Sequence, residues 1–207
     1  MKRILLLFAV LFCTMSASAQ VGIIGGLTST HTDLKGAWAD KGNLNMYHAG
    51  ILARMSLVKG FLYLQPALIY NVKGANLQEL SAASAESFQL KTGYLELPVQ
   101  LQAGFSLGKA LRLYGLAEPF AGLALNSDMF DGDQRKESMQ NLKTRWEWGV
   151  GLGAGVELFE HVQVSLKYFW NFGNPYNSDI QFDGNNVFSN FDIEKCGGIS
   201  LSLALIL

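Results

Sequence analysis

Histidines are the side chains of this chain best suited to proton transfer, and there are three of them: His31, His48 and His161. Nucleophilic or acid–base catalysis needs such a base next to a hydroxyl or carboxylate partner. Ser29 and Asp33 lie near the first two, so these four residues form a candidate catalytic group. Isolated histidines at strand ends, loops and turns are usually solvated or interfacial, and catalysis is therefore the alternative rather than the expected function.

Two stretches rich in Asp and Gly place oxygen ligands close together, as calcium loops do. One, DMFDGD, contains Asp128, Asp131 and Asp133, and the other, SDIQFDGNN, contains Asp179 and Asp183. Neither has the twelve-residue spacing of a calcium loop, and this composition is common in loops that bind no metal. We therefore expect no metal and no other cofactor.

The first residues resemble a secretory signal, because basic, apolar and small residues follow one another in that order. Two basic residues precede an apolar run over 4–12, and Ala17-Ser18-Ala19 offers the small residues of a cleavage site. A lipid anchor on Cys13 is not expected, because Leu11 and Phe12 are too large for such a signal. The sequence predicts a cleaved signal peptide over 1–19 and one domain over 20–207.

Composition excludes several other classes of protein. Removing the two basic residues of the leader shifts the formal charge from −1 to −3, so no strong positive field favours nucleic acid. Cys196 is then the single remaining cysteine, expected to pack as a small side chain in a strand. No later apolar run reaches the roughly 18 residues of a membrane-spanning helix, so only a closed barrel could cross a bilayer.

The mature region divides into eight segments in which apolar and polar residues alternate. Three-residue links alternate with long links, which is typical of an all-β, antiparallel up-and-down transmembrane β-barrel with short periplasmic turns and long outer loops. An even number of strands then places both termini in the periplasm. The predicted strands lie near 21–29, 45–57, 61–73, 88–107, 111–125, 144–158, 162–172 and 195–207.

Charged residues share one face of these strands with glycines, and the other face is apolar. In the sixth segment every even position from Trp146 to Leu158 is apolar, whereas the odd positions are Arg, Glu or Gly. Lipid should contact the apolar face, and the interior should hold equal numbers of basic and acidic groups that neutralise one another. A narrow ion or solute channel is the alternative. The predicted lumen charge network is Arg54, Glu96, Arg112, Glu118, Arg145, Glu147, Glu157 and Lys167.

Aromatic residues of the apolar face cluster where the strands meet the long links, as rings at a membrane interface do. This predicted aromatic girdle consists of Tyr47, Tyr70, Trp146, Trp148, Tyr168 and Trp170. Phe105 and Phe159 lie near the opposite rim. Three prolines, Pro66, Pro98 and Pro119, fall inside predicted strands, where bulges would have to accommodate them unless the strand boundaries are wrong.

Three motifs resemble the PorT-like outer-membrane β-barrel domain family of Gram-negative bacteria. They are FLYLQPALIYNVKG from Phe61 to Gly74, YLELP from Tyr94 to Pro98, and WGVGLGAGVEL from Trp148 to Leu158. The resemblance implies an eight-stranded barrel in which Pro66 and Pro98 are expected. The chain departs from the family at Ala67, where an acidic residue is common, and it ends in Leu207, where many such barrels end in an aromatic residue.

These patterns predict a protein of the outer membrane of a Gram-negative bacterium rather than a particular activity. We expect a non-enzymatic structural or surface-binding barrel with a filled polar lumen. Its expected partners are outer-membrane lipid, the barrel-assembly machinery during biogenesis, and an extracellular protein or glycan at the loops. The alternatives are a small lipid-modifying enzyme and a narrow channel. The last long link is the best candidate for contact with a partner, because it carries Phe172, Tyr176, Phe182, Phe188 and Phe191.

Overall fold

The structure is a computed structural model. It describes residues 19–35, 38–40, 44–79, 87–108, 110–131, 134–137, 142, 144–172, 180–182, 185–188 and 192–207. Nearly all of the predicted leader therefore lies outside the described residues. Within them, no helix is both long enough and apolar enough to cross a membrane.

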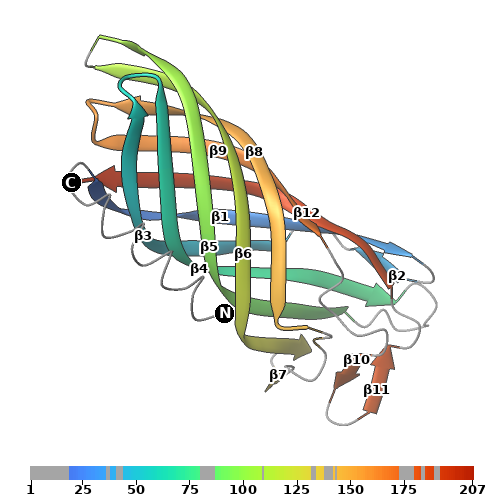
Figure 1. The fold of residues 1–207 in the computed structure, drawn as a ribbon. Helices are drawn as coiled ribbons and strands as arrows, with labels where there is room; N and C mark the ends of the chain where they lie inside the picture. Colours follow the sequence, from blue (N-terminus) through green and yellow to red (C-terminus); the bar gives the residue numbers. More distant parts are fainter. Residues whose placement is uncertain are drawn as a thin grey trace, which may run out of the picture.

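Eight long strands pair in an antiparallel closed ring, which confirms the predicted barrel (Figure 1). Each strand pairs with the two on either side of it, and β1 closes the ring by pairing with β12. In ring order the strands are β1 (Gln20–Lys35), β3 (Leu44–Val58), β4 (Leu62–Glu79), β5 (Ser87–Leu107), β6 (Leu111–Asp131), β8 (Trp146–Leu158), β9 (Val162–Phe172) and β12 (Asp192–Ile206).

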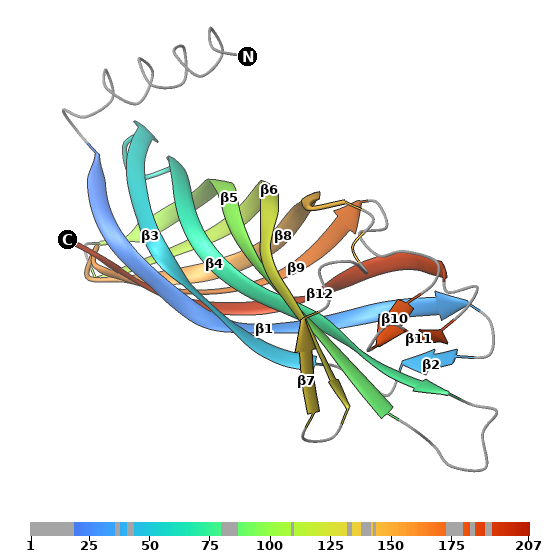
Figure 2. The same cartoon turned by 90° about the horizontal axis from the view of Figure 1, so that it is seen from below.

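Four short strands in the long connections complete the fold. They are β2 (Trp38–Asp40), paired with β4; β7 (Gln134–Glu137), paired with β6; and the hairpin of β10 (Ile180–Phe182) and β11 (Asn185–Phe188). All four lie at one end of the barrel, whereas the short turns and the C-terminus lie at the other end (Figures 1 and 2). We call the latter the short-turn end.

Apolar side chains cover the outside of the ring. Along β12, Leu201, Leu203 and Leu205 are 46, 51 and 42% exposed, whereas Ser202 between them is 4% exposed. On β5 the exposed apolar row runs from Leu95 to Leu107. Its length is roughly 40 Å, which at the usual tilt of about 40° spans roughly 30 Å, the thickness of a bilayer's hydrocarbon core.

The interior is less uniformly polar than the sequence predicts. Leu52, Ala67, Ile69 and Ala204 form a buried apolar cluster inside the ring, and Ile24 packs against it. The polar side chains described below lie around and beyond this cluster. The prediction of a polar lumen therefore holds for its charged groups but not for every layer of its interior.

Six of the eight strands extend further toward the long connections than predicted, whereas β8 begins two residues later and β9 ends as predicted; β6 shows the cause of one of the longest extensions. Tyr94 on β5 faces Ala124, but the preceding Gly93 faces Asn126, which leaves Leu125 as the extra residue of a bulge. One extra residue exchanges the two faces of the strand beyond it. The alternation in the sequence therefore breaks at Leu125, although β6 continues to Asp131.

Pro66, Pro98 and Pro119 lie inside β4, β5 and β6 without a bulge at any of them, so neither bulges nor wrong strand boundaries account for these prolines. At each proline the pairing with the preceding strand of the ring is interrupted and then resumes in the same register. The missing N–H groups thus remove local ladder bonds without changing which side chains face the lumen.

The backbone adopts positive φ angles in all three short turns. Gly60 and Gly108 have φ values of +77° and +70°, which glycine adopts without steric penalty. In the turn between β8 and β9, Phe159 and Glu160 have φ values of +53° and +63°, as the two central residues of a type I′ turn do.

Glycines of β8 face large side chains of β6 inside the ring. Phe120 lies opposite Gly149, and Tyr114 lies opposite Gly155. A Cβ atom on Gly149 would lie 2.1 Å from the backbone oxygen of Trp170 and 2.5 Å from the Phe120 ring. The glycine run of β8 therefore makes room for rings that extend across the lumen.

Candidate functional site

Charged side chains inside the ring form three groups along the barrel axis. The arginine cluster, nearest the short-turn end, comprises Arg54, Arg112, Glu157 and Tyr63. The middle pair comprises Lys167 and Glu118, and the lysine cluster, toward the long connections, comprises Lys73, Glu96 and Glu147. The structure thus places seven of the eight predicted lumen charges inside the ring: Arg54, Glu96, Arg112, Glu118, Glu147, Glu157 and Lys167.

The prediction for Arg145 is wrong, because this residue precedes β8 and is exposed. Strand parity has no meaning for a residue in a bend, and the backbone oxygen of Arg145 instead accepts a hydrogen bond from Ala124 N at 2.7 Å. Among the described residues, Lys73 is a further basic residue of the lumen that the sequence analysis did not single out, and it is 3% exposed. It lies on the same face of β4 as Tyr63 and Gln65, and this parity was the signal that could have identified it.

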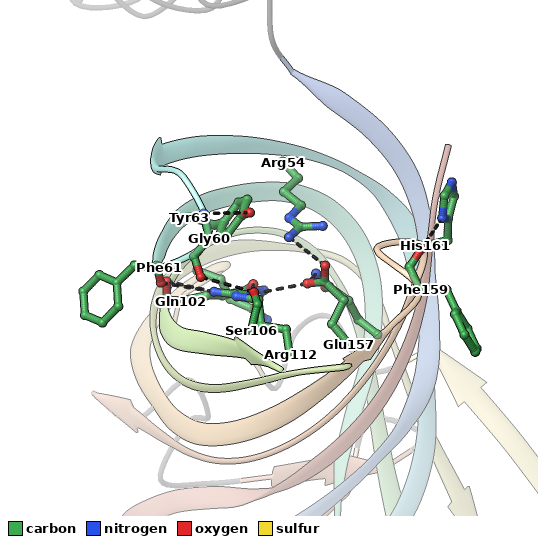
Figure 3. Close-up of polar contacts among 12 residues, drawn as sticks. Arg54, Gly60, Phe61, Tyr63, Gln102, Ser106, Arg112, Glu157, Phe159 and His161 are labelled. Atoms are coloured by element: carbon green, nitrogen blue, oxygen red, sulfur yellow. Dashed lines mark hydrogen bonds and ion pairs between the residues drawn. The ribbon is translucent and has the colours of Figure 1, made fainter. Parts of the chain in front are cut away.

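In the arginine cluster two guanidinium groups share one carboxylate. Arg54 Nη2 lies 2.9 Å from Glu157 Oε1, and Arg112 Nη1 lies 3.2 Å from Glu157 Oε2. The Tyr63 ring contacts both cations, with 4.0 Å from its centroid to Arg54 Cζ and 4.3 Å to Arg112 Cζ. Gln163 Nε2 also donates to Glu157 Oε2 at 3.1 Å. Figure 3 shows both arginines reaching Glu157 inside the ring.

The middle pair connects β9 with β6. Lys167 Nζ forms an ion pair with Glu118 Oε1, and Gln100 donates its amide N–H to the other oxygen of the same carboxylate. Gln102 Nε2 donates to Gln100 Oε1 at 2.9 Å, while its own Oε1 accepts from Arg112 at 3.2 Å. Amide side chains thus join the middle pair to the arginine cluster in one hydrogen-bonded network.

In the lysine cluster the ratio of cations to carboxylates is the reverse of that in the arginine cluster. Two carboxylates share one ammonium group. Lys73 Nζ lies 2.7 Å from Glu96 Oε1 and 3.1 Å from Glu147 Oε1. Asn71 and Asn171 donate further hydrogen bonds to these carboxylates, at 3.0 Å to Glu96 and 2.7 Å to Glu147.

Aromatic rings surround the ammonium group of Lys73. Its Nζ lies 4.4 Å from the centroid of Phe120, 5.0 Å from that of Phe169 and 5.6 Å from that of Tyr94. The rings of Phe120 and Phe169 pack edge to face at 6.2 Å. Side chains from β4, β6, β9 and β5 therefore converge at one level of the lumen, and cation–π contacts add to the ion pairs there.

His48 faces the lumen and is 3% exposed, instead of lying at a strand end beside Ser29 as predicted. Its Nδ1 lies 3.0 Å from Thr28 Oγ1, and its Nε2 lies 3.0 Å from Ser202 Oγ. A serine hydroxyl next to a histidine is half of a catalytic dyad, but here Ser202 is 4% exposed and the third partner is a hydroxyl rather than a carboxylate. This arrangement supports packing rather than catalysis.

The other candidate residues for catalysis and metal binding do not form a site among the described side chains. Ser29 lies on the face of β1 opposite Thr28, and His161 is exposed in a short turn. The side chains of His31 and Asp33 lie outside the described part of the chain, as do those of Asp131, Asp133, Asp179, Asp183 and Cys196. The side chains of Tyr176, Phe182, Phe188 and Phe191 lie outside it too, whereas Phe172 is exposed and its ring packs at a tilt against Trp148, with 4.9 Å between centroids.

The six residues of the predicted girdle are on the outer face of the ring. Tyr47, Trp146, Trp148, Tyr168 and Trp170 are exposed, whereas Tyr70 is half-buried and donates its hydroxyl proton to Asn126 Oδ1 at 2.9 Å. The rings of Tyr168 and Trp170 pack at a tilt of 59°, with 4.7 Å between centroids. At the opposite rim, Phe159 points away from the lumen (Figure 3) and Phe105 is exposed.

The apolar exterior, the ionised interior and the closed ring define a transmembrane β-barrel. Residues 15–177 match the family described as outer membrane protein beta-barrel domain. The chain belongs to this family, and it is therefore a β-barrel of the outer membrane.

Two solved structures are similar to this chain in fold. The chain is 12% identical to Ail, the attachment invasion locus protein of Yersinia pestis, with a TM-score of 0.42 over 91% of this chain and 98% of that chain. It is 14% identical to Neisserial surface protein A (NspA), with a TM-score of 0.42 over 91% of this chain and 97% of that chain. None of the curated proteins matches the sequence.

Proposed function

We propose that this outer-membrane barrel is a non-enzymatic structural or surface-binding protein with a filled lumen, and that its long extracellular loops carry the binding role. The observation that carries the proposal is the set of ion pairs that cross the lumen. Arg54–Glu157 joins β3 to β8, and Lys73–Glu147 joins β4 to β8, although neither pair of strands is adjacent in the ring. Side chains that bond across the lumen occupy its interior at these levels, which supports a filled lumen.

The lysine cluster supports a closed interior rather than an ion path. An ion path needs polar groups that are free to solvate a passing ion. Here both carboxylates of the cluster already bind Lys73 and an asparagine, and the rings of Phe120 and Phe169 pack beside them. Conduction would require these contacts to break.

The proposed binding role rests on the length of the strands at the end opposite the short turns. β5 and β6 each have 21 residues, whereas about 10 are enough for a tilted strand to cross a bilayer. We infer that the excess length holds the adjoining loops above the membrane surface, where loops on a rigid scaffold can bind a protein or a glycan.

The proposed orientation places the short turns and both termini in the periplasm. It rests on the leader expected over 1–19, on the even number of strands and on the general rule that outer-membrane barrels have short periplasmic turns. We also infer a PorT-like member of the family from the motifs around Pro66 and Pro98. Lipid and the assembly machinery are the partners that this placement implies.

Planar-bilayer recording of residues 20–207, purified and refolded in detergent, tests the filled lumen. We expect no stable conductance steps, with a known porin in the same bilayer as the positive control. Reproducible steps from this protein would overturn the proposal. Epitope tags then test orientation: a tag inserted at residues 82–84 should be labelled on intact cells, whereas a tag at Lys109 should be labelled only after the outer membrane is opened.

A further inference from the structure

We propose that the short-turn mouth of the lumen binds a small oxyanion, a phosphate or a carboxylate, beside Arg54 and Arg112. This inference goes beyond the proposed function, because it assigns a ligand to the end of the barrel opposite the long loops. It does not depend on which side of the membrane that end faces.

The first argument is the charge balance of the arginine cluster. Arg54 and Arg112 are each 3% exposed, and Glu157 is the one carboxylate that pairs with both among the described residues. The cluster therefore has one positive charge in excess. The lysine cluster has the opposite excess, but the neutral pair Lys167–Glu118 lies between the two. Since a buried charge without a counter-charge is costly, the arginine cluster favours an additional anion.

The second argument is that both guanidinium groups have unused donors. The Nε atoms of Arg54 and Arg112 are buried without a hydrogen-bond partner. Arg54 contacts Glu157 through Nη2. Arg112 uses Nη1 for Gln102 and Glu157, and its Nη2 donates to the backbone oxygens of Phe61 and Gln102 at 3.4 and 3.5 Å, which leaves Nε as its unused donor. Buried donors in folded proteins are normally satisfied, and the planar guanidinium fork matches the oxygens of a phosphate or carboxylate.

The third argument is that the two cations are held in place before any ligand binds. The Tyr63 ring packs against both guanidinium groups, and its hydroxyl accepts a hydrogen bond from Gly60 N at 3.4 Å. Figure 3 shows Arg54, Tyr63 and Arg112 arranged around the lumen near the turn that contains Gly60. A site of this kind loses little conformational entropy when an anion binds.

A cavity of about 230 Å³ lies at the short-turn end beside Arg112 and Tyr63, and Arg54 reaches its wall through Glu157 and Tyr63 rather than lining it directly. Its lining includes Tyr63, Arg112, Ser106 and the turn residues Lys59, Gly60 and Gly108. Lys59 adds a further positive charge, whereas Glu157 and Glu160 also line the cavity. Walls of mixed sign disfavour a polyanion, so we infer a ligand with one oxyanion group.

NMR of the purified protein with ¹⁵N-labelled arginine tests this proposal. The protein is kept in a maltoside detergent, which contains no phosphate. We expect sodium phosphate or sodium acetate to shift the Nε–Hε signals of Arg54 and Arg112 saturably, whereas sodium chloride of equal ionic strength does not. The absence of a saturable shift with both oxyanions, and with the lipid described below, would overturn the proposal.

Two variants sharpen the test. Arg54→Gln leaves one arginine paired with Glu157, so it should fold and lose at least tenfold in phosphate affinity. Lys91→Gln on the distant end of β5 removes the same charge and should bind phosphate as the unmodified protein does. Unchanged affinity in Arg54→Gln would overturn the proposal, as would an equal loss in Lys91→Gln.

Glu157→Gln provides an independent readout. It leaves two buried arginines without a carboxylate, and phosphate should therefore raise its thermal stability more than that of the unmodified protein. Equal stabilisation of the two proteins would contradict the proposal. If Glu157→Gln does not fold, the phosphate affinity of Arg54→Gln decides whether the proposal stands.

A further arm distinguishes a free oxyanion from a lipid headgroup. A short-chain phosphatidylglycerol is titrated into the same detergent solution, with short-chain phosphatidylcholine as the control for zwitterionic lipid. Binding of inorganic phosphate supports an aqueous ligand, whereas a response to phosphatidylglycerol alone supports a lipid phosphate in the same site.

Discussion

Arg54 on β3 and Glu157 on β8 are bonded across the full width of the barrel, with 2.9 Å between Nη2 and Oε1. In the ring order three strands separate β3 from β8 in either direction, so the two residues come from opposite walls. Such a contact is possible only where the lumen is narrow enough for side chains to fill it. It links segments that lie far apart along the chain and that share no backbone ladder.

Glu157→Gln should destabilise the barrel strongly, because it leaves two buried arginines without their shared carboxylate. Breaking a buried ion pair from one side typically costs about 3–5 kcal/mol. The loss is measured as the free energy of unfolding in urea, followed by tryptophan fluorescence of the protein refolded into lipid vesicles. Arg54→Gln is the matched variant, and it should cost only about 1 kcal/mol because Arg112–Glu157 remains balanced. Equal losses would mean that charge balance does not govern this cluster.

The lysine cluster allows a test in which charges are removed together. Lys73→Met should cost about 3–5 kcal/mol, because Glu96 and Glu147 would be left as neighbouring buried carboxylates. Adding Glu96→Gln and Glu147→Gln should recover most of this loss, since neutral side chains of similar volume need no counter-charge. The same urea titration gives the coupling free energy. Losses that simply add across the three substitutions would show that these residues do not act as one cluster.

The sequence was sufficient to predict the ring, its eight strands and the outward direction of its apolar face. This is possible because lipid contact imposes a period of two on the strands, which is clearest from Trp146 to Leu158. The pattern failed where the backbone departs from a regular strand. The extra residue at Leu125 reverses the faces of β6, and Arg145 lies before β8 begins.

The sequence could not predict which lumen side chains pair with each other, for a different reason. Parity places Arg54 and Glu157 in the lumen, but which wall each one meets depends on the stagger of the closed ring. His48 shows the same limit, because its contact with Ser202 depends on β1 lying between β3 and β12. The sequence therefore predicted most members of the site and none of its pairings.

Two glycines of β8, Gly149 and Gly151, should respond differently to the same substitution by alanine, because the space around them differs. Gly149→Ala should destabilise the barrel by about 1–3 kcal/mol, because the new Cβ would clash with the Trp170 backbone and the Phe120 ring. Gly151→Ala should be neutral or stabilising by up to about 0.5 kcal/mol, because its nearest neighbour, on Lys167, lies at 3.5 Å. Urea unfolding in vesicles measures both. A loss at Gly151 as large as that at Gly149 would contradict the packing described for this strand.

The outer face can be tested by placing a charge at two depths of the same strand. Leu101 lies in the middle of the apolar row of β5, and Leu107 lies at its short-turn end. Leu101→Arg should cost about 2–4 kcal/mol, whereas Leu107→Arg should cost about 0–1 kcal/mol, because the penalty falls toward the membrane interface. Both are measured in vesicles of one lipid composition. If the two variants lose the same stability, this row does not span the hydrocarbon core.

The turn between β8 and β9 should be stabilised by replacing a residue that its backbone does not suit. Glu160 has a φ of +63°, a conformation that costs residues with a side chain about 1 kcal/mol and that glycine adopts freely. Glu160→Gly should therefore raise the free energy of unfolding by about 0.5–1 kcal/mol, and Glu160→Ala, which removes the same charge, should not. Gly108→Ala tests the converse: a Cβ there meets nothing within 4 Å, so its expected loss of about 1 kcal/mol would come from the φ of +70° alone.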